Sequence, residues 1–123
     1  MENKDSILVT LSQAIIKERD GGYKKIIQEW LASDGENLSW WFRMGNAPKR
    51  EFLYIYWVVA GRIRYRCLAT MYPSDQVTLD DGRILDGKNW ACCFDFEAIP
   101  RALQLNKKGF QGFRYFDSSN ITF

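Results

Sequence analysis

The start of the chain combines a β-prone run with helix signals. Ile7 to Thr10 is short, apolar and β-branched, which predicts a strand. The overlapping stretch Thr10 to Gln13 matches a capping box, in which the threonine caps a helix and the glutamine bonds back to it. This helix is predicted to extend to about Asp20, where Gly21-Gly22 stops it. The alternative is a helix that begins at Ser6, because the early apolar residues also fit helical spacing.

A second helix is predicted from Tyr23 to Ser33. Its apolar residues recur at helical spacing, with lysine and glutamate around them. The apolar face consists of Ile26, Ile27, Trp30 and Leu31. Asp34-Gly35 ends the helix, and from there the period of the apolar residues changes from 3.6 to 2.

The alternating part of the chain predicts at least five strands separated by turn residues. A two-residue type II′ turn is predicted at Gly61-Arg62. Asp81-Gly82 predicts a type I′ hairpin between two short runs, and Pro73 and Pro100 interrupt the strands. The main predicted strands are Leu38 to Met44, Glu51 to Val59, Arg62 to Met71, Trp90 to Phe96 and Gln111 to Phe116.

This order of elements favours an α+β fold. One strand and two helices precede a run of mostly antiparallel strands, so helices and sheet are expected to be segregated. A small antiparallel, barrel-like sheet flanked by the N-terminal helices would protect its edge strands. The chain has 123 residues, which is enough for one core, and we expect a single domain over residues 1–123.

Three arginines recur at every second position after Gly61. Arg62, Arg64 and Arg66 should therefore share one face of a strand. The predicted turn places Trp57 on that face, opposite Arg66. One interpretation is a row of phosphate contacts with Trp57 as a stacking platform for a base. The other is an exposed strand face whose charges oppose aggregation.

Aromatic residues are frequent, with five Trp, six Tyr and eight Phe. Most must lie in the core, because each buries a large area. Trp40 and Trp41 are adjacent in a predicted strand, so one points inward and the other is a candidate binding residue. The candidate nucleic-acid-binding residues are Arg43, Lys49, Arg62, Arg64, Arg66, Trp40, Trp41 and Trp57.

Charge is distributed unevenly although the net charge is only +2. So small a net charge creates no field over the whole molecule that would attract nucleic acid indiscriminately. The stretch from Lys49 to Arg66 contains five basic residues and one acidic residue, whereas Asp75 to Asp86 contains four acidic residues and one basic residue. Positive charge is therefore expected to gather on the hairpin around Gly61.

Several kinds of chemistry are excluded or disfavoured by residue content. The chain has no histidine, which excludes Ser-His-Asp and Cys-His catalysis. Its three cysteines form no CxxC pair, so we expect no metal site, and no motif indicates a cofactor. The odd cysteine count and the lack of a leader sequence predict reduced thiols and a cytoplasmic location. No apolar run approaches the roughly 20 residues that span a membrane.

Three segments carry a resemblance to a known superfamily. They are "LSWWFR", "FLYIYWVVAGRIRYRCLATMYP" and "NWACCFDFEAIPRALQL", in that order. Their order and their Trp and Pro placement resemble PUA-like domains, which include the ASCH, EVE and YTH groups. The resemblance covers about Leu38 to Phe116. It implies a β-barrel flanked by helices that binds RNA or DNA and, as in EVE and YTH members, holds a modified base in an aromatic cage.

The ASCH group has a further hallmark, G-x-K-x-x-E-x-R, after its first helix. Gly22 and Lys24 match the first half, but Ile27 and Glu29 occupy the Glu and Arg positions. Some ASCH members are small amidohydrolases that use a Lys, a Thr and a Glu, so the resemblance implies Lys24 as a catalytic candidate. The alternative for Lys24 is an ordinary exposed helix residue.

Three functional hypotheses follow. The first is a non-enzymatic module that binds RNA or DNA. The second is a small hydrolase for a nucleoside-like substrate, with Lys24 and Glu29 as its ionisable candidates. The third is a protein-interaction module with an aromatic docking face. Salt dependence separates the first from the third, because only phosphate contacts give a steep dependence of affinity on salt.

Overall fold

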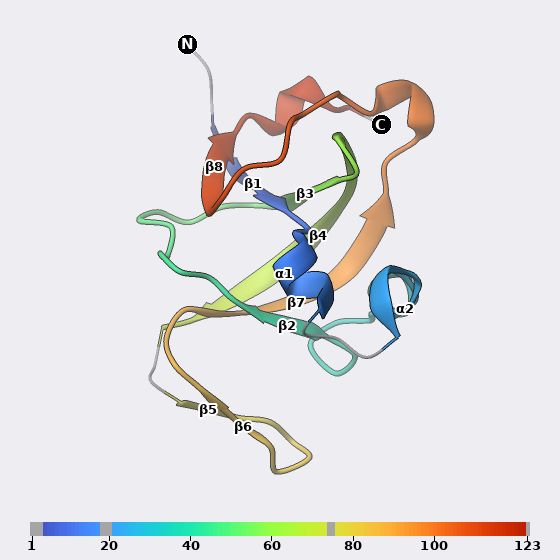
Figure 1. Cartoon of the computed structure of the whole chain (residues 1–123). Coiled ribbons are helices and arrows are strands. Elements are labelled where there is room, and N and C mark those ends of the chain that lie inside the picture. The colour runs from blue at the N-terminus through green and yellow to red at the C-terminus, as the bar shows by residue number, and fades with distance from the viewer. Residues whose placement is uncertain (1–3, 18–20, 74–75, 123) are drawn as a thin grey trace.

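The chain adopts a mostly-β fold in which one sheet curls into a half barrel (Figure 1). A computed structural model describes residues 4–17, 21–73 and 76–122. The predicted barrel-like sheet is confirmed in this coarser form. The helical share is smaller than the α+β prediction implies, because both α-helices are short.

The described residues form eight strands, two α-helices and two 3-10 helices. In chain order they are β1 (Ser6–Thr10), α1 (Gln13–Lys17), α2 (Gly22–Leu31), β2 (Trp40–Arg43), β3 (Ile55–Val59), β4 (Arg62–Tyr72), β5 (Gln76–Thr78), β6 (Ile84–Asp86), β7 (Trp90–Ala98), η1 (Arg101–Leu103), β8 (Phe113–Phe116) and η2 (Ser118–Asn120).

Six strands form the curled sheet in the order β2-β7-β4-β3-β1-β8. Strand β1 pairs in parallel with β3, and the other neighbours in the sheet are antiparallel. The predicted pairing of the strands before and after Gly61 is therefore confirmed. Strands β5 and β6 form a separate hairpin that projects from the body (Figure 1). The alternative helix from Ser6 is wrong, because that segment is a strand inserted between β3 and β8.

The first helix begins two residues later than its capping box suggests. Ser12 Oγ accepts a hydrogen bond from the backbone N–H of Ile15 at 3.3 Å, so Ser12 acts as the cap. Thr10 Oγ1 instead accepts from the backbone N–H of Phe110 at 3.2 Å and ties the C-terminal segment to β1. The predicted end near Asp20 lies outside the described residues. The second helix is confirmed as α2.

The register of the β3–β4 hairpin differs from the prediction. Its two turn residues are Ala60 and Gly61, whose φ angles of 50° and 79° make a type I′ turn and not a type II′ turn at Gly61-Arg62. Val59 therefore pairs with Arg62. Arg64 is then an extra residue on β4, because the register shifts between the Trp57 and Val58 pairs.

The β5–β6 hairpin also uses a different turn. Gly82 has a φ of 88°, but Asp81 is outside the left-handed region, which a type I′ turn requires at both central residues. The backbone N–H of Leu79 donates to Arg83 O at 2.8 Å, and that of Gly82 donates to Leu79 O at 2.9 Å. These bonds fit a longer hairpin loop with glycine at its single left-handed position.

The sheet buries apolar side chains on both faces. The concave face holds an aromatic cluster in which Trp30 of α2 stacks on Phe96 at 4.6 Å and contacts Trp57 at 4.8 Å between ring centroids. The C-terminal segment covers a second cluster on the other face. That cluster comprises Leu8, Tyr56, Val58, Ile63, Ile99 and Ile121. Strand β3 is therefore buried along its whole length.

The turn geometry predicts a stabilising substitution at Ala60. A left-handed backbone disfavours alanine, whereas asparagine tolerates it. We expect Ala60→Asn to raise the free energy of unfolding by about 0.5–1 kcal/mol in urea titrations. Ala60→Val is the matched control and should lower it, because a β-branched side chain is disfavoured at positive φ. Equal stability of the two variants would contradict the type I′ turn.

A carboxylate that joins the two ends of the chain predicts a pH-dependent stability. Asp5 accepts hydrogen bonds from Ser118 N at 3.0 Å and Ser118 Oγ at 2.8 Å. Partial burial raises the pKa of Asp5, but these bonds and one from Ser6 outweigh it and lower the pKa below the usual value. The stabilisation is therefore complete above the pKa of the unfolded chain and is lost as the pH falls through the folded pKa.

We expect Asp5→Asn to cost about 1–2 kcal/mol of unfolding free energy at pH 7, because it removes charge-assisted hydrogen bonds. The difference from wild type should shrink towards zero in acid. Thermal melts between pH 7 and pH 2 measure it, and a difference that stays constant over this range is the opposing result.

Candidate functional site

The three arginines after Gly61 do not share one face, which corrects the predicted row. Residues that pair directly across two strands point to the same side of a sheet. Arg62 pairs with Val59 and so lies on the side of the aromatic cluster, whereas Arg66 pairs with Tyr56 on the other side. Arg64 is the extra residue between them. The one-residue change in the turn and the bulge together split the row.

Two of these arginines are bound within the fold. Arg64 Nε donates to the backbone carbonyl of Val59 at 2.7 Å. Arg66 donates to Tyr56 OH at 3.5 Å, forms an ion pair with Glu97 at 3.3 Å and lies over the ring of Tyr54 at 4.4 Å. Burial works to lower the pKa of Arg66, but Tyr56 and Glu97 outweigh it and raise the pKa above its usual value. Arg66 therefore remains charged inside a structural network.

Trp57 does not present a stacking surface, contrary to the prediction. It is 0% exposed, and its Nε1 donates to Cys67 Sγ at 3.4 Å. Trp40 is 4% exposed and belongs to the same aromatic cluster. The prediction that one of Trp40 and Trp41 points inward is confirmed, and Trp41 is the half-buried residue of the pair. Stacking of a base on Trp40 or Trp57 is incompatible with this burial.

A groove lies between the two edge strands of the sheet, β2 and β8. Two adjoining cavities of about 270 Å³ and 760 Å³ share residues of the loop after β2 and of the segment before β8. We call this the edge groove, and its main polar and aromatic residues are Arg43, Asn46, Lys49, Gln111, Phe113 and Tyr115.

The edge groove has a positive lining. Arg43 and Lys49, both predicted as nucleic-acid-binding residues, are exposed and belong to its lining, and none of the described residues that line the groove is acidic. The guanidinium of Arg43 lies close to Gly87, where a Cβ would come within 2.7 Å of Nη1. The structure thus places two of the eight predicted residues along the edge groove, Arg43 at one of its cavities and Lys49 at the other.

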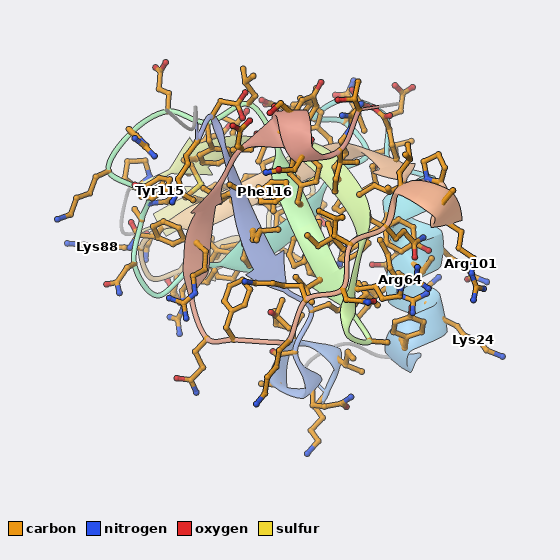
Figure 2. All side chains as sticks on the ribbon, turned by 90° about the horizontal axis from the view of Figure 1, so that it is seen from above. Lys24, Arg64, Lys88, Arg101, Tyr115 and Phe116 are labelled. Atoms are coloured by element: carbon orange, nitrogen blue, oxygen red, sulfur yellow. The ribbon has the colours of Figure 1, made fainter. Side chains whose placement is uncertain are left out.

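Aromatic rings of β8 complete the edge groove and were missed by sequence reasoning. Phe113 and Tyr115 are half-buried, alternate along β8 and have centroids 5.4 Å apart. The guanidinium of Arg50 lies 4.1 Å above the Tyr115 ring, and Tyr115 OH accepts from the backbone N–H of Lys49 at 3.1 Å. Figure 2 shows Tyr115 and Lys88 on one side of the molecule, with Lys24 and Arg101 on the other.

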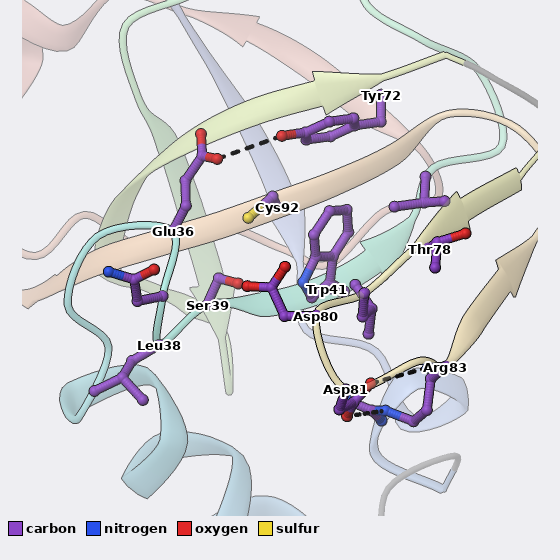
Figure 3. Close-up of a pocket in the computed structure, with 13 residues that line it drawn as sticks. Glu36, Leu38, Ser39, Trp41, Tyr72, Thr78, Asp80, Asp81, Arg83 and Cys92 are labelled. Atoms are coloured by element: carbon purple, nitrogen blue, oxygen red, sulfur yellow. Dashed lines mark hydrogen bonds and ion pairs between the residues drawn. The ribbon is translucent and has the colours of Figure 1, made fainter.

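A third cavity, of about 480 Å³, is acidic (Figure 3). It lies between the β5–β6 hairpin and the sheet face formed by β2, β7 and β4, and we call it the acidic cleft. Its main chemical groups come from Glu36, Trp41, Tyr72, Asp80, Asp81 and Cys92. Trp41, the outward tryptophan and a candidate binding residue, thus lines a pocket, but most of the charged residues around it are carboxylates.

The residues suggested by the ASCH hallmark form no comparable site. Lys24 and Glu29 are exposed on α2, and neither lines the edge groove or the acidic cleft. Figure 2 shows Lys24 projecting away from the body. This arrangement gives the hydrolase hypothesis no support.

The described part of the chain contains no group of three or more potential metal ligands among His, Cys, Asp and Glu. It also contains no helix that is long and apolar enough to cross a membrane.

No protein-family model, curated protein or solved structure matches this chain. The resemblance to PUA-like domains therefore stays a prediction, and only the edge groove and the acidic cleft bear on function.

The burial of the three cysteines predicts how their thiols react with a labelling reagent. All three cysteines are free and buried, and Cys92 is only 1% exposed although it lines the acidic cleft. Burial raises the pKa of the Cys92 thiol, and the charge of Glu36 raises it further. A hydrogen bond with the Ser39 hydroxyl lowers this pKa but does not outweigh them. We expect negligible reaction with an aromatic disulfide reagent at pH 7.5 in the native protein and three reactive thiols after denaturation. The buried position of Cys92 would be contradicted if one thiol of the native protein reacted fast and the Cys92→Ser variant lost that reaction.

Proposed function

We propose that the chain binds single-stranded nucleic acid in the edge groove. The observation that carries the proposal is the edge groove, which is lined by an exposed basic residue in each of its two cavities, Arg43 in one and Lys49 in the other, and by no acidic residue among the described residues. A row of positive charge beside partly exposed rings is the usual arrangement for binding a single strand without regard to its sequence.

The groove supplies a partner for each part of a nucleotide. Arg43 and Lys49 suit phosphate oxygens, because charge-assisted hydrogen bonds to phosphate are strong. The half-buried rings of Phe113 and Tyr115 suit base stacking, and the amides of Asn46 and Gln111 suit base edges or sugar hydroxyls. The Arg50 guanidinium over Tyr115 adds a third positive charge at the rim.

The arrangement favours a single strand over a duplex. Duplex readers insert a helix or a β-ribbon into a DNA groove. The tip of the projecting β5–β6 hairpin carries Asp80, whose charge repels phosphates, whereas Asp81 is paired with Arg83. A strand with unpaired bases can instead enter the cavity between β2 and β8.

The test compares a groove variant with a charge-matched control. We expect wild type to bind fluorescent 20-nucleotide polythymidine and polyuridine at low salt, measured by anisotropy. In Arg43→Gln/Lys49→Gln, binding should weaken, and the slope of log affinity against log salt should fall by about 1.4, because each lost single-strand phosphate contact contributes about 0.7.

The control is Lys24→Gln/Arg101→Gln, which removes the same charge from exposed positions on the other side of the molecule. It should keep the wild-type slope. Equal loss in both double variants would indicate a net-charge effect, and no binding by folded wild type at low salt would refute the proposal.

A further inference from the structure

The acidic cleft is a built cavity that the proposed function does not use. Its floor is a cross-strand row, because Trp41 of β2 pairs with Cys92 of β7, which pairs with Thr70 of β4. One wall is the loop before β2, which contributes Glu36 and Ser39, and the other is the β5–β6 hairpin. Figure 3 shows these neighbouring strands with the loop and the hairpin around them.

The aromatic wall of the cleft suits a compact cation better than a flat base. Trp41 and Tyr72 have centroids 5.2 Å apart and planes tilted by 45°. A base sandwiched between two rings needs about 7 Å, twice the spacing of stacked bases. The two neighbouring rings instead belong to one wall of the cleft, against which an ammonium group can lie.

One carboxylate is fixed beside this surface. Glu36 accepts from Thr70 Oγ1 at 2.7 Å and from Tyr72 OH at 3.3 Å. Burial raises the pKa of Tyr72, and the charge of Glu36 raises it further, so the tyrosine stays protonated and continues to donate. An ionised carboxylate has about four acceptor sites, so Glu36 can still accept hydrogen bonds from a ligand.

The cleft carries an excess of negative charge. Asp81 is neutralised by Arg83, whose Nε lies 2.7 Å from Asp81 Oδ2. Glu36 and Asp80 form no ion pair within the described part of the chain. An aromatic surface flanked by two unpaired carboxylates offers a cation both a π face and counter-charges.

From the cavity, its aromatic wall and these carboxylates, we infer that the acidic cleft binds an alkylammonium group. Trp41 and Tyr72 contact its carbon chain and ammonium, while Glu36 and Asp80 accept its N–H bonds. A free polyamine and a lysine side chain of a peptide share this chemistry. The site is separate from the edge groove, so it stands or falls independently of nucleic-acid binding.

The test uses isothermal titration calorimetry with two amines, spermidine and the peptide Gly-Lys-Gly with its N-terminus acetylated and its C-terminus amidated. We expect at least one to bind wild type in low salt, and the tighter one identifies the source of the ammonium. The matched ligand control is the same blocked peptide acetylated on the lysine side chain as well, which keeps the carbon chain but has no ammonium group. It should not bind measurably. Absence of binding by both amines, or equal binding of the control peptide, overturns the inference.

Variants locate the site. Asp80→Asn changes an exposed hairpin residue and should weaken amine binding about tenfold, the size of one charge-assisted contact. Glu36→Gln should do the same, and the matched control Glu51→Gln, at an exposed residue outside the cleft, should not. Asp80→Asn should retain oligonucleotide binding. Equal weakening by Glu51→Gln would indicate nonspecific charge attraction and overturn the inference.

Discussion

The packing of Trp30 against Trp57 and Phe96 is the interaction on which the rest of the structure depends. Trp30 comes from α2, Trp57 from the centre of the sheet and Phe96 from β7, and the first two are 0% exposed. Such rings bury large areas, so replacing one by alanine typically costs about 3–5 kcal/mol. Trp40 packs edge-on against both Trp30 and Trp57 and brings β2 into the same cluster. The sheet therefore curls around a core of aromatic side chains.

The packing of this aromatic cluster also explains why the molecule has an edge groove. The cluster occupies the space inside the curl, and β2 and β8 remain the edges of the sheet. Side chains from both edges, including Phe42 and Phe113, line the groove between them. A cavity between the two edge strands is thus a consequence of how the core is packed. Its charge comes from Arg43, the last residue of β2, and from Lys49 in the segment that follows.

Most elements could be predicted from the sequence, but the strand register, which decides the face on which each side chain lies, could not. Alternation located the strands, because one buried face requires a period of two. A one-residue shift reverses every side chain, and this shift depended on Ala60 accepting a left-handed backbone, which alanine seldom does. The extra residue at Arg64 then divided Arg62 from Arg66. Neither event leaves a signal in local hydrophobic pattern, so the arginine row was a reasonable prediction that the fold does not realise.

The candidate sites could also be predicted only in part, because they combine residues that are far apart in the sequence. Arg43 and Lys49 were identified from charge alone, but their neighbours Phe113 and Tyr115 lie in the last strand, and only the sheet order brings them together. One of Trp40 and Trp41 was correctly expected to face outward, but which one was left open, and the hairpin that supplies Asp80 makes the pocket of Trp41 acidic. With a net charge of only +2, no whole-molecule field overrides these local signs. Exposed charges are screened over about 8–10 Å, so each cavity presents mainly its own charge to a ligand. The charge of the acidic cleft opposes phosphate and that of the edge groove opposes ammonium, so the two proposed sites call for ligands of opposite charge.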